Sequence, residues 1–233
     1  MSDSNCALIV GAGKGLSASL ARLLAREGMK VALAARDTGK LAGLVKETGA
    51  LAVAADATVA ADIDRLFSDV EAKLGVPDLV VFNAGYRTRG PITGLVPAEV
   101  ELTLKGSAFG GFLVGQQAAR RMLPRASGSI LFTGASASVK GYANSSAFAM
   151  GKFALRGLAQ SMARELGPQG LHVAHIVIDG GITTGEGDPR AGQRGDDGML
   201  SPDEIAKSYL QLHRQQRNAW TWELDLRPWV EKF

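Results

Sequence analysis

Short apolar runs alternate along most of the chain with longer segments of helical periodicity. The apolar runs span residues 7–11, 30–35, 50–55, 78–85, 128–134 and 171–181. Most of them are continuously apolar, which is typical of strands that are covered on both faces. The helical segments lie between them, at 16–28, 38–49, 60–75, 97–123 and 147–166. This order predicts one doubly wound α/β domain spanning 1–233, in which two layers of helices enclose a parallel sheet.

The composition argues against several kinds of partner. The net charge is only +3 over 233 residues, and the basic residues are scattered, which disfavours a nucleic-acid partner. A single cysteine, Cys6, cannot form an internal disulfide, and the three histidines lack the spacing of metal ligands. We see neither a signal-peptide n-region nor an apolar run of membrane-spanning length. We therefore expect a cytoplasmic protein that acts on a small molecule and has no nucleic-acid, membrane or metal partner.

The first apolar run leads directly into GAGKGLS, residues 11–17, at the start of a predicted helix. Three glycines at a strand-to-helix turn let backbone amides approach a pyrophosphate near the helix N-terminus. In the context of alternating strands and helices, this turn predicts a dinucleotide-binding Rossmann fold.

The end of the second predicted strand bears on the choice of cofactor. Many NAD-binding domains have a carboxylate here that binds the ribose hydroxyls, but this chain has Arg36. Lys14, in the glycine turn, adds a second cation. Two cations where a 2′-phosphate would lie favour NADP(H) over NAD(H). Asp37 is an alternative ribose ligand, although its place after Arg36 favours a role at the start of the next helix.

A Gly- and Asp-rich segment, residues 183–198, follows the sixth apolar run. In doubly wound sheets, loops at the carboxyl ends of the strands form the ligand crevice. The segment is therefore a candidate lid, with disorder as the alternative.

Four segments spread along nearly the whole chain contain recognisable motifs. Residues 10–17 are similar to TGxxxGxG, with Val10 for the Thr and Ser17 for the last Gly. FNAG at 82–85 resembles NNAG, SAFGGF at 107–112 resembles NxxGxF, and DGGITT at 179–184 resembles PGxxxT. In the order and spacing of these motifs the chain resembles the short-chain dehydrogenase/reductase family, which implies the family's fold and its nicotinamide dinucleotide cofactor. Ser107 then stands where the family's active-site Asn is usual.

The glycine turn, the two cations and the resemblance together predict the residues that bind NADP(H). They are Gly11, Gly13, Lys14, Gly15, Leu16, Arg36, Asp56, Ala57, Asn83, Ala84, Gly85, Lys152, Gly180, Ile182 and Thr184.

The catalytic positions depart from the family pattern. The family's YxxxK becomes Phe148-Ala149-Met150-Gly151-Lys152, and its catalytic Ser is replaced by Ala135, with Ser136 beside it. The resemblance implies that Lys152 still binds the nicotinamide ribose. An aromatic residue at helical spacing commonly packs in a core, but the surrounding motif favours a Phe148 ring that lines the substrate crevice.

Reduction of a carbonyl requires a proton for the oxygen, and Phe148 has none to give. Three alternatives stay open for the proton. Tyr142, or else Tyr86, donates it; Ser136 acts with a water held by Lys152; or the substrate, such as an iminium or an activated enone, needs no enzymic acid. The candidate catalytic residues are therefore Lys152, Ser136, Phe148 and Tyr142.

We expect an NADP(H)-dependent oxidoreductase that transfers hydride to a small carbonyl, enone or imine. The alternative is a non-catalytic dinucleotide-binding protein that serves as a redox sensor or scaffold. The resemblance implies a homodimer or homotetramer, joined partly through the helices that contain Ser107 and Lys152. The segment 217–233 contains three tryptophans and predicts a last strand, buried at the sheet edge or at a subunit interface.

Overall fold

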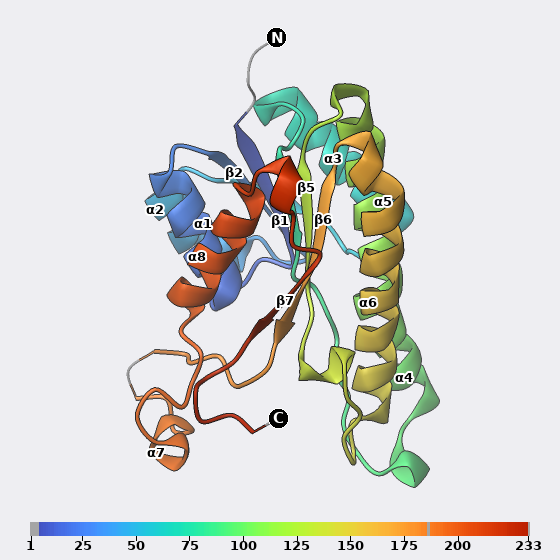
Figure 1. Cartoon of the computed structure of the whole chain (residues 1–233), viewed down its shortest axis with the longest axis vertical. Helices are drawn as coiled ribbons and strands as arrows, with labels where there is room; N and C mark the ends of the chain where they lie inside the picture. Colours follow the sequence, from blue (N-terminus) through green and yellow to red (C-terminus); the bar gives the residue numbers. More distant parts are fainter. Residues whose placement is uncertain (1–4, 186, 233) are drawn as a thin grey trace.

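Within residues 5–185 and 187–232, which the computed structural model describes, seven strands form one parallel sheet (Figure 1). Their order across the sheet is β3-β2-β1-β4-β5-β6-β7. The bounds are β1 (Cys6–Val10), β2 (Lys30–Ala35), β3 (Leu51–Ala54), β4 (Leu79–Phe82), β5 (Ser129–Thr133), β6 (His172–Ile178) and β7 (Glu223–Leu226). Every residue of β1, β4, β5 and β6 is buried, as their unbroken apolar sequences predict. The predicted doubly wound fold is confirmed.

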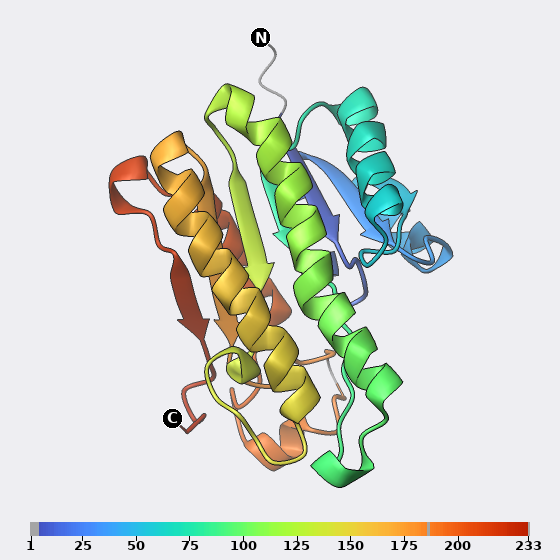
Figure 2. The ribbon, with the colours of Figure 1, turned by 90° about the vertical axis from the view of Figure 1, so that its right-hand side faces the viewer.

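Helices cover both faces of the sheet (Figure 1). One face carries α1 (Leu16–Arg26), α2 (Ala42–Thr48) and α8 (Pro202–His213). The other carries α3 (Ala60–Leu74), α5 (Gly110–Met122) and α6 (Ser146–Leu166), and Figure 2 shows α5 and α6 lying side by side. Two further helices extend beyond the sheet at the carboxyl ends of its strands: α4 (Pro97–Leu104), before α5, and α7 (Ala191–Arg194), after β6.

An apolar core fills each of the two spaces between sheet and helices. Phe67 of α3 and Phe82 of β4 are fully buried in one core, and Leu24 of α1 and Leu33 of β2 are fully buried in the other. Full burial of one such side chain contributes roughly 1.5–3 kcal/mol. The two cores together hold the strands rigidly, so that the loops at their carboxyl ends keep fixed positions.

The helix predicted over 97–123 is interrupted by a π-helical turn at Lys105–Phe109. Glycines let this stretch approach neighbouring loops closely: a Cβ on Gly106 would lie 3.0 Å from the Tyr86 nitrogen, and one on Gly110 would lie 3.0 Å from the Ala57 oxygen. π turns occur often at functional sites, and this one carries Ser107 into the protein.

The C-terminal segment forms β7 at the sheet edge, as predicted. Trp220 stacks on His172 with ring centroids 4.9 Å apart, and the Trp222 ring lies 5.4 Å from the guanidinium carbon of Arg156. Trp229, in contrast, is 81% exposed. Of the two predicted alternatives, packing at the sheet edge therefore does not extend to Trp229, and burial at a subunit interface stays a prediction.

A polar cluster connects β6, β7 and α6. Arg156 donates hydrogen bonds of 2.6 and 2.8 Å to the Glu223 carboxylate, and His175 Nδ1 lies 3.1 Å from Glu223 Oε2. Burial lowers the pKa of His175 to about 4, so the ring is neutral at pH 7 and donates through Nδ1. The side-chain partner of this buried histidine is thus a carboxylate of the neighbouring strand.

The described part of the chain contains no helix that is long and apolar enough to cross a bilayer. It also contains no group of three or more His, Cys, Asp or Glu side chains that could hold a metal ion.

Candidate active site

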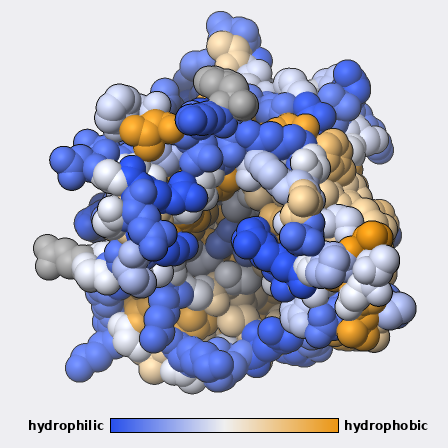
Figure 3. All heavy atoms as spheres, turned by 90° about the horizontal axis from the view of Figure 1, so that it is seen from below, coloured by the Kyte–Doolittle hydropathy of each residue, from blue (hydrophilic) through white to orange (hydrophobic). Residues whose placement is uncertain are grey.

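A cavity of about 880 Å³ lies at the carboxyl ends of the strands, where β1 and β4 are neighbours. The strand order reverses at this point, which is where doubly wound sheets bind their ligands. Figure 3 views this end of the molecule and shows a surface hollowed near its middle. The cavity is lined by Gly11, Gly13, Lys14, Arg36, Asp56, Ala57, Asn83, Ala84 and Gly85 among the residues that the sequence predicted to bind the cofactor.

The glycine turn has the geometry of a phosphate-binding loop. Gly11 has a φ of +89°, and a Cβ there would lie 2.4 Å from the Ala84 nitrogen, so only glycine lets the ends of β1 and β4 come this close. A Cβ on Gly13 or Gly15 would meet no atom within 4 Å. These two glycines therefore border open space at the N-terminus of α1, which begins at Leu16. The residues present fit the pyrophosphate of a dinucleotide.

Ser17, which replaces the family's last glycine, helps to fix this turn. Its hydroxyl donates to the Gly11 oxygen at 3.1 Å and accepts a bond of 2.8 Å from Asn83 Nδ2. The serine thus joins the two loops that enclose the cavity. Sequence comparison alone shows it only as a departure from the motif.

Three cations, Lys14, Arg36 and Lys40, line the cavity on the side formed by the loops after β1 and β2. Lys40 was not predicted, because it lies within a helical segment; its spacing of four residues from Arg36 was the only signal. Asp37 also lines the cavity, but its Oδ1 accepts from the Gly39 amide at 3.0 Å and its Oδ2 lies 3.4 Å from Lys40 Nζ. Asp37 therefore organises the start of the next helical turn and holds Lys40.

Asp56 lies in the loop after β3 and lines the cavity. Its Oδ1 accepts bonds of 2.8 and 2.7 Å from the amide and hydroxyl of Thr58. Its own amide donates to Asp62 Oδ2 at 2.9 Å. These contacts hold the carboxylate and the adjacent Ala57 at the cavity wall.

Lys152 lies on α6 and is almost completely buried. Its Nζ donates a 2.8 Å hydrogen bond to the Thr133 oxygen at the end of β5. Because this partner is neutral, burial lowers the pKa of Lys152 to about 8. The ammonium form predominates at pH 7, and its remaining hydrogens are available to a ligand.

The Phe148 ring lies among cations. Lys152 Nζ is 5.9 Å from the ring centroid, and the guanidinium carbon of Arg87 is 4.4 Å from it. The ring is half-buried rather than enclosed in either core. Core packing of this ring is therefore disfavoured, and its place at the substrate crevice stays a prediction.

Two of the candidate proton donors, Ser136 and Tyr142, lie in the segment between β5 and α6, whereas Tyr86 follows β4 and lines the cavity. Ser136 begins a short 3₁₀ helix and is half-buried, while the hydroxyl of its neighbour Ser138 accepts from the Ala135 amide at 3.1 Å. Tyr142 is 45% exposed, and Lys140 Nζ lies 5.8 Å from its ring centroid. Ser138 is thus committed to the loop's own structure, which leaves Ser136 and Tyr142 as the candidate donors of this segment.

Ser107 is held inside the π turn at the place where the family's Asn is usual. It is fully buried, and its Oγ has no hydrogen-bond partner within the described residues. A Cβ on Gly151 would lie 3.2 Å from this oxygen, so Ser107 packs against the residue that precedes Lys152.

Asp179, which replaces the proline of the family's PGxxxT, is buried next to two cations. Lys140 Nζ lies 3.3 Å from its Oδ2, and Arg227 Nη1 lies 3.9 Å from the same oxygen. The carboxylate therefore connects the loop after β6 with the Tyr142 loop and with the C-terminal segment. No sequence signal identified these partners.

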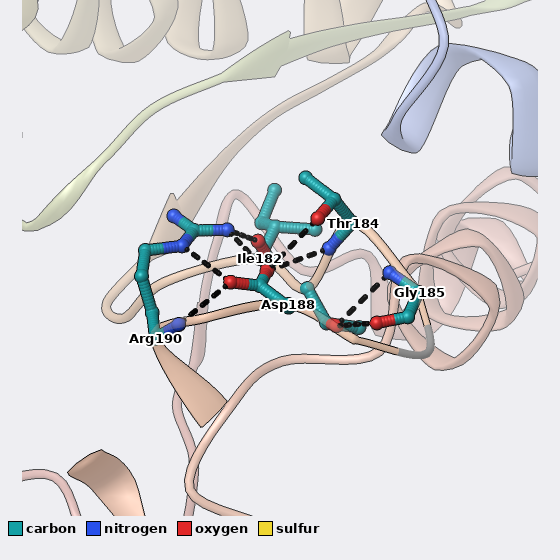
Figure 4. A network of polar contacts seen from close by, with 6 residues as sticks. Ile182, Thr184, Gly185, Asp188 and Arg190 are labelled. Carbon is teal, nitrogen blue, oxygen red and sulfur yellow. Dashed lines mark hydrogen bonds and ion pairs between the residues drawn. The ribbon is translucent and has the colours of Figure 1, made fainter. Parts of the chain in front are cut away.

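The candidate lid is organised around Asp188 (Figure 4). The Asp188 carboxylate accepts bonds from the amide and hydroxyl of Thr184 and from the amide and guanidinium of Arg190. The Arg190 guanidinium holds the pKa of this carboxyl well below its ordinary value. Arg190 also donates to the Ile182 oxygen at 2.7 Å. The described part of the segment is therefore a structured loop, and its Thr184 is engaged by Asp188 rather than by the cavity.

Comparison with known proteins gives the family. Residues 5–191 match the family model described as short chain dehydrogenase. The chain belongs to this family. The 3-oxoacyl-(acyl-carrier-protein) reductase MabA of Mycobacterium avium is 31% identical over 181 residues, covering 78% of this chain and 68% of that protein.

Two solved structures of short-chain dehydrogenases are similar over almost their whole length. One, from Rhodopseudomonas palustris, is 33% identical with a TM-score of 0.84, covering 97% of this chain and 99% of the other. A metagenomic short-chain oxidoreductase in complex with NADP is 25% identical with a TM-score of 0.82, covering 96% and 97%. The short-chain dehydrogenases are oxidoreductases that bind a nicotinamide dinucleotide.

The predicted site residues of this short-chain dehydrogenase fall into separate parts of the crevice. Leu16 and Gly15 begin α1 beside the cavity. Lys152 and Phe148 lie on α6, and Ser136 and Tyr142 precede that helix. The loop after β6 carries Gly180, Ile182 and Thr184. None of these belongs to the lining of the 880 Å³ cavity, which is therefore formed by the loops after β1 to β4 and a part of α4 and its π turn.

Proposed function

We propose that the protein is an NADP(H)-dependent oxidoreductase that transfers hydride to a small carbonyl, enone or imine. The observation that supports NADP(H) most directly is the set of three cations, Lys14, Arg36 and Lys40, around the end of the cavity where a 2′-phosphate belongs. The glycine turn would hold the pyrophosphate, and Asp56 and Ala57 would border the adenine. Lys152 would bind the nicotinamide ribose through the hydrogens that its bond to Thr133 leaves free.

Bound NADPH supplies the hydride that adds to the electrophilic carbon of the substrate. The electron pair of the C=O bond then moves to the oxygen, which takes one proton to complete the alcohol. Phe148 cannot supply this proton. Within the crevice, a water held by the Lys152 ammonium, with Ser136 nearby, is a better source than Tyr142, whose side chain lies beside Lys140 at the surface. An iminium or an activated enone, in contrast, needs no acid from the protein.

The second candidate function, a dinucleotide-binding protein without catalysis, has one observation in its favour. The site has a phenyl group and Ala135 where the family has two hydroxyls, while the cofactor cavity keeps its glycines and cations. Such a protein would bind NADPH and turn over no carbonyl compound.

Fluorescence titration of the purified protein with NADPH, and separately with NADH, tests the cofactor assignment. We expect NADPH to bind at least ten times more tightly than NADH. Equal affinities for NADPH and NADH would contradict the role assigned to Lys14, Arg36 and Lys40. If the protein bound neither cofactor, the oxidoreductase proposal would be overturned. Turnover of a panel of ketones, enones and cyclic imines with NADPH then separates the enzyme from the non-catalytic binder.

We also propose that the protein is a homodimer or homotetramer. The exposed large apolar side chains of the π turn, α5 and α6 include Phe109, Phe112, Met150 and Phe153. Multi-angle light scattering should give a mass of two or four chains, and a Phe112→Glu substitution should lower it. A monomeric mass for the wild-type protein at micromolar concentration would contradict this proposal.

A further inference from the structure

Arg87 stands between the cofactor cavity and the altered catalytic position. It follows Tyr86, which lines the cavity at the end of the β4 loop. The next residue, Thr88, is buried, and its hydroxyl donates to Glu99 Oε2 of α4 at 2.7 Å. This bond anchors the loop, so that the exposed side chain of Arg87 is held beside α6 rather than extending freely into solvent.

The guanidinium of Arg87 lies over the ring of Phe148, with its carbon 4.4 Å from the ring centroid. A cation in this position is held by the quadrupole of the ring, and the contact uses none of its five N–H donors. The phenyl ring therefore acts as a support for the guanidinium. Its donors stay available to a ligand at the mouth of the active site.

Most other arginines of the described chain face a carboxylate. These pairs are Arg22–Glu47, Arg65–Asp62, Arg121–Glu71, Arg125–Asp78, Arg156–Glu223, Arg190–Asp188, Arg194–Glu231, Arg214–Glu27 and Arg227–Asp225. Arg87 differs from them, because within residues 5–185 and 187–232 it makes no ion pair and no hydrogen bond. Glu99, which is bonded to this loop, is engaged by Thr88 instead.

A second positive group faces the same ring. Lys152 Nζ lies 5.9 Å from the Phe148 centroid, and its bonded partner is the neutral Thr133 oxygen. Two cations thus flank one aromatic side chain with no bonded carboxylate from the described chain between them. An anion from outside the protein would complete this arrangement.

We propose that Arg87 binds a carboxylate of the substrate, so that the substrate is an oxo acid rather than a neutral carbonyl compound. This inference rests on the proposed function, since it assigns the substrate class of the same site. A single guanidinium matches a carboxylate through two parallel N–H···O bonds. With its carboxylate on Arg87, a short oxo acid extends its carbonyl group toward Lys152.

Binding of the substrate through its carboxylate also helps to compensate for the missing general acid at position 148. Interactions with a part of the substrate that does not react can be used to orient the part that does. A substrate held at Arg87 keeps its carbonyl in place for hydride transfer while a water supplies the proton.

The test uses matched pairs of substrates, the 2-, 3- and 4-oxo acids of four to six carbons and their methyl esters, with saturating NADPH. The wild-type protein is compared with Arg87→Gln, which removes the positive charge, and with Arg87→Lys, which keeps the charge but lacks the two parallel N–H donors of a guanidinium. Arg89→Gln, two residues along the same loop, is the control. Thermal melting of each variant establishes that it is folded.

We expect wild-type kcat/KM to favour at least one oxo acid over its ester by roughly 10- to 100-fold, as a charged bidentate contact implies. Arg87→Gln should abolish this preference by lowering kcat/KM for the acid and leaving kcat/KM for the ester unchanged. The preference of Arg87→Lys should lie between those of the wild type and Arg87→Gln. Arg89→Gln should show the same preference as the wild type. An equal loss for acid and ester would overturn the proposal, because Arg87 would then act on the reacting oxygen. A preference for phosphorylated carbonyl compounds over oxo acids would also overturn it.

A binding measurement separates failure of this inference from failure of the proposed function. Calorimetric titration of the protein with the same oxo acids, with and without NADP⁺, needs no turnover. Binding that Arg87→Gln weakens at least tenfold supports the carboxylate site even if no substrate is reduced. Oxo acids that bind equally to wild type and Arg87→Gln contradict it, whatever the outcome of the NADPH titration.

Discussion

The two halves of the crevice have diverged from the family pattern to different degrees. In the cofactor half, Gly11 still forms its close approach to Ala84, and Ser17 compensates for a lost glycine by bonding Asn83. In the catalytic half, Phe148 and Ala135 have lost both hydroxyls, and Lys152 keeps its position on α6. Binding of a pyrophosphate depends on backbone geometry, and it tolerates side-chain changes that preserve this geometry. Proton transfer depends on single functional groups, and it does not tolerate their loss.

The substitution expected to have the largest effect restores the missing acid. A Phe148→Tyr side chain would place a phenol beside the Lys152 ammonium, which lowers the pKa of the phenol and lets it protonate a developing alkoxide. We expect reduction of simple ketones to rise by about 100- to 10,000-fold, the usual worth of general acid catalysis. The rate of NADPH oxidation in the steady state, followed by the absorbance of NADPH, measures this gain.

A Phe148→Leu variant is the matched control, because it removes the ring without adding a proton. If Phe148→Tyr gives no gain with any substrate, the rest of the catalytic half is incompetent, and the non-catalytic function becomes the better one.

A smaller effect is expected from the cations of the cofactor half. Replacing Arg36 and Lys40 together by Ala should weaken NADPH binding by roughly 10- to 100-fold, because two charge-assisted contacts to the 2′-phosphate are lost. NADH binding should hardly change, since NADH lacks that phosphate. Fluorescence titration of both cofactors measures the ratio. A parallel loss of NADH binding would show that these side chains support the loop instead.

The smallest effect concerns pH. Burial lowers the pKa of Lys152 to about 8, so the ammonium to which we assign ribose and water binding is lost as the pH rises through 8. We expect kcat/KM to be level below pH 7 and to fall up to about tenfold per pH unit above 8. The Phe148→Leu variant should show the same alkaline limb, because it keeps Lys152. A rate that stays level to pH 10 would contradict this role of the ammonium.

The sequence predicts the framework better than the site. Continuous apolar runs specify the strands because both faces of this sheet are covered, and Arg36 was found because a strand end is easy to locate. Lys40 was missed because a lysine in a helical segment looks like solvated surface. The π turn that buries Ser107 depends on close approaches of Gly106 and Gly110 to other loops, which no local periodicity records. Asp179 stood out as a replaced proline, but its partners, Lys140 and Arg227, come from distant segments.

The position of β7 has a consequence for biosynthesis. Glu223 follows Arg156 by 67 residues, yet it binds this arginine on the helix that carries Lys152, and β7 pairs with β6 in the sheet. During translation the loops of residues 11–85 that line the cavity can form well before β7 is synthesised. The helix that carries Lys152 acquires this support only after residues 223–226 have left the ribosome. A nascent chain that has not yet reached β7 is therefore expected to bind dinucleotide before it holds Lys152 in place.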